Sequence, residues 1–290
     1  MHFAIFGNPS PGRHNGNEHR FFDLLHSYGD NIAVEKEYLT FLQDEMKWNL
    51  PFAQSIESED FQADVVISIG GDGTFLRTAA HVGSKEIPMV GINTGHLGFL
   101  ADITEDKAGN AIRMIHNGQY TLEKRSLLEI STDRIPKGVR PFALNDIAVL
   151  KHDVSSMISI HALVDGQPLT TYMADGLVVA TPTGSTAYSL SVGGPVIAPG
   201  TDVMELTPVA PHSLTMRPLI LQNSRIITLN IESRSHNFLL SIDGRSFSCP
   251  DGTEIKIRRA PFHINVIKPE GSEFFSTLRE KMMWGADSRR

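Results

Sequence analysis

The chain has 290 residues, 41% of them hydrophobic and 20% charged, and its formal net charge is −7. This length allows two modest domains with buried cores, and no apolar run approaches the ~20 residues that a bilayer span requires. The acidic balance argues against a general affinity for nucleic acid. The single cysteine, Cys249, excludes an internal disulfide, so we expect a cytoplasmic protein with a buried, unreactive thiol.

The first third of the chain predicts strands that alternate with helices. Apolar runs at residues 3–6, 65–69 and 88–92 predict strands, and the second run is typical of a strand covered on both faces. Hydrophobic residues at helical spacing predict helices that include residues 75–81 and 107–116. We therefore expect an α/β Rossmann-like parallel-sheet domain over residues 1–120.

After about residue 120 the pattern changes. Short runs rich in Val, Ile, Leu and Thr at residues 158–164, 226–231, 238–242 and 255–257 predict antiparallel strands. A hairpin loop is expected at 133–138 and a short amphipathic helix at 274–284. The expected second domain is antiparallel and β-rich over residues 121–271, and the segment 272–290 is expected to join the first domain.

Asp-Gly pairs, which favour turns, occur five times in the chain. Asp165-Gly166 lies between two strand-like runs and predicts a plain hairpin. Asp251-Gly252 is also expected to be a turn. Asp243-Gly244 resembles a hairpin tip, and a functional role there is the weaker alternative.

Asp72-Gly73 has a different setting, because it lies in Gly70-Gly71-Asp72-Gly73-Thr74 between a buried-type strand and a helix. Three glycines let the chain bend sharply and let a ligand approach the backbone. The helix N-terminus favours a phosphate group, and open α/β sheets bind ligands at this edge. We therefore expect Asp72 to orient a metal or to accept a hydroxyl proton.

Asp175-Gly176 precedes a second apolar run, which ends in Thr181-Pro182-Thr183-Gly184-Ser185-Thr186. Small hydroxyl residues before a helix can form an anion or ribose site, and they can equally do no more than cap the helix. The residues alone leave these two interpretations open. No GxxxxGK[ST] loop occurs and no GxGxxG follows the first strand, so neither a P-loop nor a standard dehydrogenase fingerprint is present.

At these residues the sequence resembles the NAD kinase family. The run from Gly70 to Thr74 is shared with diacylglycerol and sphingosine kinases and, in variant form, with phosphofructokinases. The stretch from Gly91 to Leu100, the pair Asn145-Asp146 and the run from Asp175 to Ser191 resemble NAD kinases more specifically. The resemblance continues through Gly193-Gly194-Pro195, Pro211-His212, Arg217-Pro218 and Asp243-Gly244 to Thr277-Leu278-Arg279, and so covers most of the chain.

The resemblance implies a role for each matched residue. Asp72 matches the acceptor of the proton from the ribose 2′-hydroxyl of NAD, and Arg77 is either a phosphate partner or a solvated surface arginine. The remaining residues implied to bind substrate are Gly73, Phe99, Asn145, Asp146, Asp175, Thr186, Ala187, Tyr188, Ser189, Leu190, Ser191 and Asp243. Asp146 stands where the family usually has Glu, Met173 stands where some close relatives have Arg, and Arg245 stands where Gln is common. These departures leave the choice between NAD and NADH open.

The resemblance thus implies an enzyme that transfers the γ-phosphoryl group of ATP, another nucleotide or polyphosphate to NAD and produces NADP. It further implies Mg²⁺ or another divalent cation held mainly through the donor phosphates, with no dedicated metal ligands in the protein, and a cytoplasmic homo-oligomer, expected to be a tetramer. Two alternatives are a lipid kinase of the diacylglycerol kinase type and a non-catalytic dinucleotide sensor.

Overall fold

The computed structural model describes residues 1–10, 18–95, 98–153, 156–270 and 274–284. Contacts within the chain divide it into two units. The first comprises Met1–Lys124 and Ile264–Arg290, and the second comprises Arg125–His263. Two long strands, β7 (Tyr120–Ser131) and β18 (Glu254–Pro269), have residues in both units.

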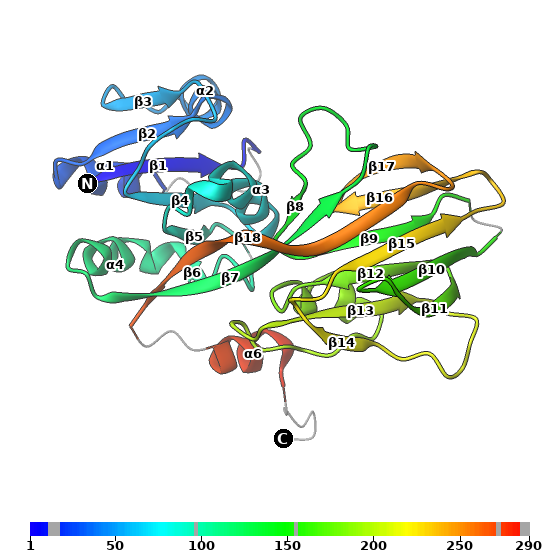
Figure 1. Ribbon diagram of the computed structural model, residues 1–290. Helices are drawn as coiled ribbons and strands as arrows, with labels where there is room; N and C mark the ends of the chain where they lie inside the picture. Colours follow the sequence, from blue (N-terminus) through cyan, green and yellow to red (C-terminus); the bar gives the residue numbers. More distant parts are fainter. Residues whose placement is uncertain (11–17, 96–97, 154–155, 271–273, 285–290) are drawn as a thin grey trace. The chain divides into compact units, whose positions relative to one another are not determined.

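The first unit contains a parallel sheet in the order β18-β5-β4-β1-β2-β3, with β6 beside β5 (Figure 1). Its strands are β1 (His2–Gly7), β2 (Asn31–Glu35), β3 (Ala53–Ile56), β4 (Val65–Ile69), β5 (Met89–Asn93) and β6 (Ile103–Thr104). Every residue of β4 is buried because β4 lies between β1 and β5, which explains the continuous apolar run.

The helices of the first unit lie between its strands along the chain, and the last one follows β18. They are α1 (Glu18–Ser27), α2 (Lys36–Asp44), α3 (Asp72–Val82), the 3-10 turn η2 (Gly83–Lys85), α4 (Glu105–His116) and α6 (Phe274–Met282). Apolar side chains of α1, α2 and α4 pack with those of the sheet in one continuous core. The expected Rossmann-like parallel sheet is confirmed.

The second unit contains an antiparallel sheet in the order β14-β13-β12-β9-β16-β17. Its strands are β9 (Asp146–Lys151), β12 (Gly176–Ala180), β13 (Val203–Val209), β14 (Leu219–Gln222), β16 (Asn237–Ile242) and β17 (Arg245–Pro250). A second antiparallel layer joins β10 (Ile158–Val164), β11 (Gln167–Ala174) and β15 (Ile227–Glu232) to β18, and β7 pairs with β8 (Phe142–Ala143). The inner faces of the two layers form the core of this unit.

The predicted antiparallel, β-rich character of this unit is confirmed, and so are two of its turns. Asp165 and Gly166 have φ angles of 50° and 79° and join β10 to β11 as a two-residue hairpin. The loop at 133–138 lies between the paired strands β7 and β8. The expected helix after the Thr181–Thr186 run is short, since it consists of the 3-10 turn η3 (Gly184–Thr186) and the single turn α5 (Tyr188–Ser191).

Candidate active site

The glycine loop after β4 places Asp72 at the first residue of α3, at the carboxyl end of a parallel strand. Gly70 has a φ of 145°, and a Cβ there would lie 2.4 Å from the Thr74 hydroxyl oxygen, so the bend requires glycine. A Cβ on Gly71 or Gly73 would meet nothing within 4 Å. The loop therefore has open space beside its backbone, as a ligand-binding loop needs.

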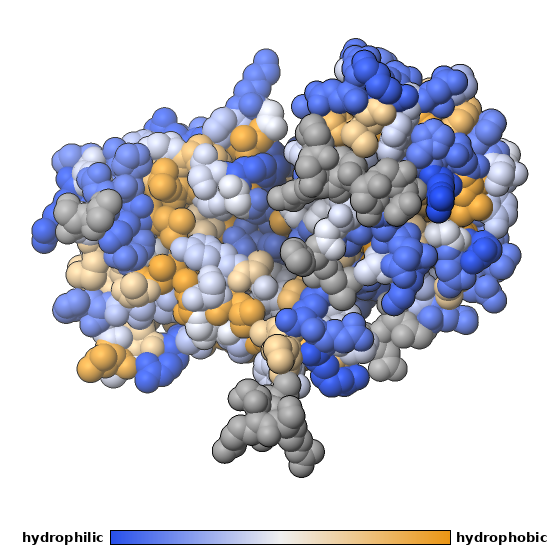
Figure 2. Space-filling model, turned by 180° about the vertical axis from the view of Figure 1, so that it is seen from behind, coloured by the Kyte–Doolittle hydropathy of each residue, from blue (hydrophilic) through white to orange (hydrophobic). Residues whose placement is uncertain are grey.

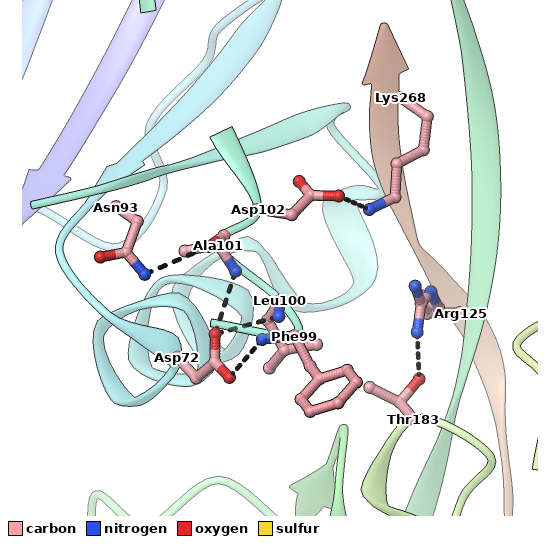
Figure 3. Close-up of polar contacts among 9 residues, drawn as sticks. All are labelled: Asp72, Asn93, Phe99, Leu100, Ala101, Asp102, Arg125, Thr183 and Lys268. Carbon is pink, nitrogen blue, oxygen red and sulfur yellow. Dashed lines mark hydrogen bonds and ion pairs between the residues drawn. The ribbon is translucent and has the colours of Figure 1, made fainter. Parts of the chain in front are cut away.

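The carboxylate of Asp72 is held by three consecutive backbone N–H groups (Figure 3). The N–H of Phe99 donates to Oδ2 over 2.8 Å, and those of Leu100 and Ala101 donate to Oδ1 over 3.0 and 3.1 Å. A Cβ on Gly98 would lie 1.8 Å from Oδ1, so only glycine at this position leaves room for the acid. The two glycine motifs of the sequence thus form one site.

Asn93 fixes the second motif at the end of β5. Its side-chain amide donates to the carbonyl oxygen of Ala101 over 3.2 Å, and its Oδ1 accepts the N–H of Gly95 over 2.7 Å. The bonds close the loop on itself and present the three donors to Asp72. His96 and Leu97 of the same motif lie outside the described residues.

Two lysines of the first unit, Lys268 and Lys281, interact with the residues that surround Asp72. Lys268 forms an ion pair of 2.5 Å with Asp102, and both side chains are largely buried. The Nζ of Lys281 in α6 lies 4.5 Å from the centre of the Phe99 ring. Burial lowers the pKa of Lys281 to about 8, and the negative charges of Asp72 and Asp102 oppose this lowering.

The predicted phosphate partner Arg77 is half-buried and already engaged. Its guanidinium donates to the carbonyl oxygen of Gly7 and lies 3.5 Å from the carboxylate of Glu35. Burial raises the pKa of Glu35, and Arg77 opposes this rise. A phosphate contact by Arg77 stays a prediction.

Asp243 in the second unit repeats the arrangement of Asp72. Its carboxylate accepts the N–H groups of Leu144, Asn145 and Asp146 over 2.8, 2.8 and 3.2 Å. Burial raises the pKa of Asp243, and these three bonds, followed by the charge of Arg245, counteract the rise. Asp243-Gly244 is the two-residue tip between β16 and β17, as predicted, and it also fixes the backbone of Asn145 and Asp146.

A buried pair of carboxyl groups lies across three adjacent strands. Asp146 on β9 and Glu205 on β13 are both register partners of Ala180 on β12, so all three are in one row. Burial, with the charges of Asp243 and Glu205, raises the pKa of Asp146 to about 7. Burial also raises the pKa of Glu205 to about 7.

The pattern of the sequence did not reveal Glu205, which is fully buried. Its carboxylate oxygens have no hydrogen-bond partner within the described part of the chain, because the nearby hydroxyl of Ser189 donates to Thr207 instead. The nearby Ser189 hydroxyl lowers the pKa of Glu205, but burial raises it by more. One signal was available, since Glu205 is a lone acid within the otherwise apolar run of β13.

The predicted run from Thr181 to Ser191 packs on the Asn145–Asp146 backbone. The Thr181 hydroxyl donates to the Leu144 carbonyl over 2.5 Å, and a Cβ on Gly184 would lie 2.1 Å from the Asn145 carbonyl oxygen. Asn145 Oδ1 is buried and accepts no hydrogen bond from any described residue. The segment and Asn145 are therefore brought together, as the resemblance implies.

Several hydroxyl groups of this run already donate within the chain. Those of Thr186 and Ser191 donate to the carbonyls of Thr183 and Tyr188, and that of Ser189 donates to Thr207. Ala187 has φ and ψ angles of −105° and −126° and joins η3 to α5, and Leu190 is half-buried. Neither N-cap residue, Thr183 for η3 or Ala187 for α5, makes a side-chain capping bond within the described residues, so these bonds are structural without being helix caps. Each hydroxyl oxygen keeps acceptor capacity for a ligand.

Asp175 and Tyr188 lie near the same row of residues. Asp175 forms an ion pair of 2.8 Å with Lys151. The pKa of Tyr188 is raised by burial first and then by the charges of Asp146 and Asp175. Asp146, Asp175 and Tyr188 therefore share one electrostatic environment within the second unit.

An acid in a glycine loop, at the carboxyl edge of a parallel sheet and the start of a helix, is a site suited to binding a phosphate group, and it agrees with the phosphotransferase class that the sequence resembles. Two family models match the chain: the ATP-NAD kinase N-terminal domain over residues 26–120 and the ATP-NAD kinase C-terminal domain over residues 144–269. The chain belongs to the ATP-NAD kinase family, and it is a kinase acting on NAD.

Curated relatives agree with this assignment. The chain is 51% identical over 289 residues to an NAD kinase of Bacteroides fragilis and 42% identical over 287 residues to one of Porphyromonas gingivalis. These alignments cover 100% and 99% of both chains, respectively.

Two solved structures share the fold over nearly the whole chain. Yeast NADH kinase complexed with NADH has a TM-score of 0.87 and 26% identity, covering 99% of this chain and 89% of that one. An NAD kinase from Archaeoglobus fulgidus in complex with ATP has a TM-score of 0.76 and 25% identity, covering 98% and 99%.

Proposed function

We propose that the enzyme transfers the γ-phosphoryl group of ATP to the 2′-hydroxyl of the adenosine ribose of NAD, with Asp72 as the proton acceptor. The observation that carries this proposal is the amide-bound carboxylate of Asp72, beside open space at the start of α3. Phosphoryl transfer asks a protein mainly for positioning and for neutralisation of charge, and a carboxylate fixed at three points provides the positioning.

The remaining acceptor capacity of Asp72 suits a hydroxyl group. An ionised carboxylate has about four lone-pair sites, and Oδ2 accepts one backbone N–H whereas Oδ1 accepts two. The 2′-hydroxyl would donate to Oδ2. Its O–H bond breaks with the proton passing to Asp72, its oxygen bonds to the γ-phosphorus, and the bond to the β–γ bridging oxygen breaks with its electron pair leaving on ADP.

We also propose that residues of the second unit contact NAD. Asn145 carries a buried side-chain oxygen with no partner among the described residues, and Asp146 follows it on a backbone held by Asp243. Together with Asp175 and Tyr188 these groups offer acceptors for ribose hydroxyls and for the adenine amino group. We assign NAD as the acceptor, and the likeness to an NADH kinase makes NADH the competing acceptor to test.

A divalent cation fits this site through the donor rather than through the protein. No group of three or more His, Cys, Asp or Glu side chains in the described ranges could hold a metal ion by itself. Mg²⁺ on the donor phosphates would offset negative charge during transfer. We further propose that the protein is a cytoplasmic homo-oligomer, as the family resemblance of the sequence implies. Among the described residues, no helix is long and apolar enough to cross a membrane.

The test is an NADP-formation assay with purified protein, NAD, ATP and Mg²⁺, in which wild type is compared with Asp72→Asn. Loss of the proton acceptor should lower kcat by about 10²–10⁴-fold and leave the Kd for NAD within a few-fold. Asp60→Asn, at an exposed acid of the same unit, is the matched control and should leave kcat unchanged. Near-normal turnover by Asp72→Asn would remove Asp72 from this role.

The same assay separates the alternatives. A lipid kinase would phosphorylate diacylglycerol in place of NAD, and a dinucleotide sensor would bind NAD without releasing ADP. Replacing ATP by polyphosphate, and NAD by NADH, defines the donor and the acceptor. The full-length relatives named as NAD kinases favour transfer to NAD over both alternatives.

A further inference from the structure

Lys281 is a buried cation beside the proposed proton acceptor. It lies on α6, near the C-terminus, and its Nζ is 4.5 Å from the centre of the Phe99 ring. Phe99 is the residue whose N–H binds Oδ2 of Asp72. The ammonium group and the acid are therefore connected through a single residue, and both belong to the first unit.

The ammonium of Lys281 has no hydrogen-bond acceptor among the residues that the structure describes, although its Nζ is buried. An ammonium has three donors, and leaving them unmatched in a buried position is costly. The other cations near Asp72 differ, because Lys268 is paired with Asp102 and Arg77 with Gly7 and Glu35. Lys281 thus has donors available for an incoming anion.

The charges that face Lys281 come from two other elements, one loop and its own helix. Asp72 is at the start of α3, Asp102 precedes β6, Lys268 is on β18 and Glu280 is its neighbour on α6. Burial lowers the pKa of Lys281 to about 8, and the charge of Asp72 is the largest opposing influence. At neutral pH most of the Lys281 side chains are therefore protonated, and a bound polyphosphate would favour that form further.

We propose that Lys281 is a further catalytic residue, whose ammonium binds the non-bridging oxygens of the phosphoryl group in transfer. The inference rests on the proposed function, since that function places the transferred phosphoryl group between the donor and Asp72. Lys281 forms no covalent bond; its charge and N–H donors compensate the negative charge of the transferred group. The Phe99 ring restricts the side chain from one side, so the ammonium is positioned before the donor arrives.

The first experiment measures NADP formation by wild type, Lys281→Met, Lys281→Arg and Lys107→Met. Lys281→Met keeps most of the unbranched side chain and removes the charge. The kcat should fall by about 10²–10³-fold, with KM for NAD changed less than about threefold. Lys281→Arg should recover at least a tenth of the wild-type kcat, because it restores the charge. Lys107→Met removes an exposed cation of the same unit and should behave as wild type.

The second experiment uses a pH profile, which remains informative if Lys281→Met folds poorly. In wild type, kcat/KM for ATP should fall as pH rises above about 8, because the ammonium loses its proton. In Lys281→Arg this fall should be absent up to pH 9.5, since arginine stays protonated.

Two results would overturn the proposal. One is a folded Lys281→Met enzyme whose kcat is within threefold of wild type, and the other is a wild-type profile that stays flat to pH 9.5. Failure of the wild type to form NADP would instead contradict the proposed function. The two failures are therefore distinguishable within one set of assays.

Discussion

Each unit contains, among the residues that the structure describes, a carboxylate that binds three consecutive backbone N–H groups. Asp72 binds the N–H groups of residues 99–101, and Asp243 binds those of residues 144–146. Each acid lies at a tight turn, and each fixes a loop that is distant in sequence. In the first unit the acid itself is the proposed reacting group, whereas in the second it orients Asn145 and Asp146.

This arrangement makes Gly98 a sensitive position. Gly98→Ala would place a methyl group where Oδ1 of Asp72 now lies, so either the acid or the loop must move. A displacement of about 1 Å in a reacting group can lower kcat by roughly 10²-fold, and we expect a loss of that size in the NADP-formation assay. Gly109→Ala in α4 adds the same methyl group 3.4 Å from Leu24, an ordinary contact, and should leave kcat unchanged. Wild-type kcat in Gly98→Ala would contradict the geometry of the Asp72 site.

Among the elements, β13 combines an apolar strand pattern with one fully buried acid, Glu205. In the unfolded chain Glu205 ionises near its ordinary value of 4.5, whereas in the folded protein it stays protonated up to about pH 7. The folded state therefore binds more protons between these values, and the free energy of unfolding falls as pH rises through this range. Asp146, whose pKa is also raised to about 7, lowers the free energy of unfolding in the same way as pH rises.

Glu205→Gln should remove the contribution of Glu205 to this pH dependence. The amide cannot ionise, so the variant should exceed wild type by about 1–3 kcal/mol in the free energy of unfolding at pH 8 and lose that advantage at pH 5. Urea denaturation at the two pH values measures the difference. Glu254→Gln, at an exposed acid on β18, is the control and should show no such change. An advantage equal at both pH values would show that Glu205 does not titrate within this range.

The elements themselves were largely predictable from sequence, because their signals are local. The apolar run of β4, the Asp165-Gly166 hairpin and the helix after the glycine loop each depend on neighbouring residues. The helix α5 has a single turn because Gly193, with a φ of 91°, follows soon after it, and a glycine in this conformation is a usual helix stop.

The contacts within the sites were less predictable than the elements. Sequence reasoning identified Asp72 and the stretch that holds Gly98 as separate motifs, and it could not show that they touch. Asp146 and Glu205 are 59 residues apart in sequence and meet only because β9 and β13 both flank β12. Lys281 was missed because a lysine in an amphipathic helix usually points into solvent.

For the whole molecule, the surface of the second unit bears on the proposed oligomer. Leu214, in the segment between β13 and β14, is 93% exposed. Other large hydrophobic side chains of the unit that are exposed are Met157, Leu169, Met173, Ile220 and Ile226. Figure 2 shows hydrophobic residues in small groups among hydrophilic ones on the face that it draws. Single exposed hydrophobic residues are common, and Leu214 is the most exposed of those described in this unit, so it is the position at which to test burial in an oligomer.

Leu214→Asp should therefore shift the protein toward smaller species. A charge at an apolar contact costs desolvation free energy in the assembly and almost nothing in the separated chain, so the fraction of assembled protein falls. Sedimentation velocity over a range of concentrations measures this shift. Leu122→Asp alters a half-exposed leucine of the first unit and is the matched control. If wild type and Leu214→Asp both sediment as the same assembly, Leu214 lies outside the interface. If wild type sediments as a monomer, the proposal of a homo-oligomer is wrong.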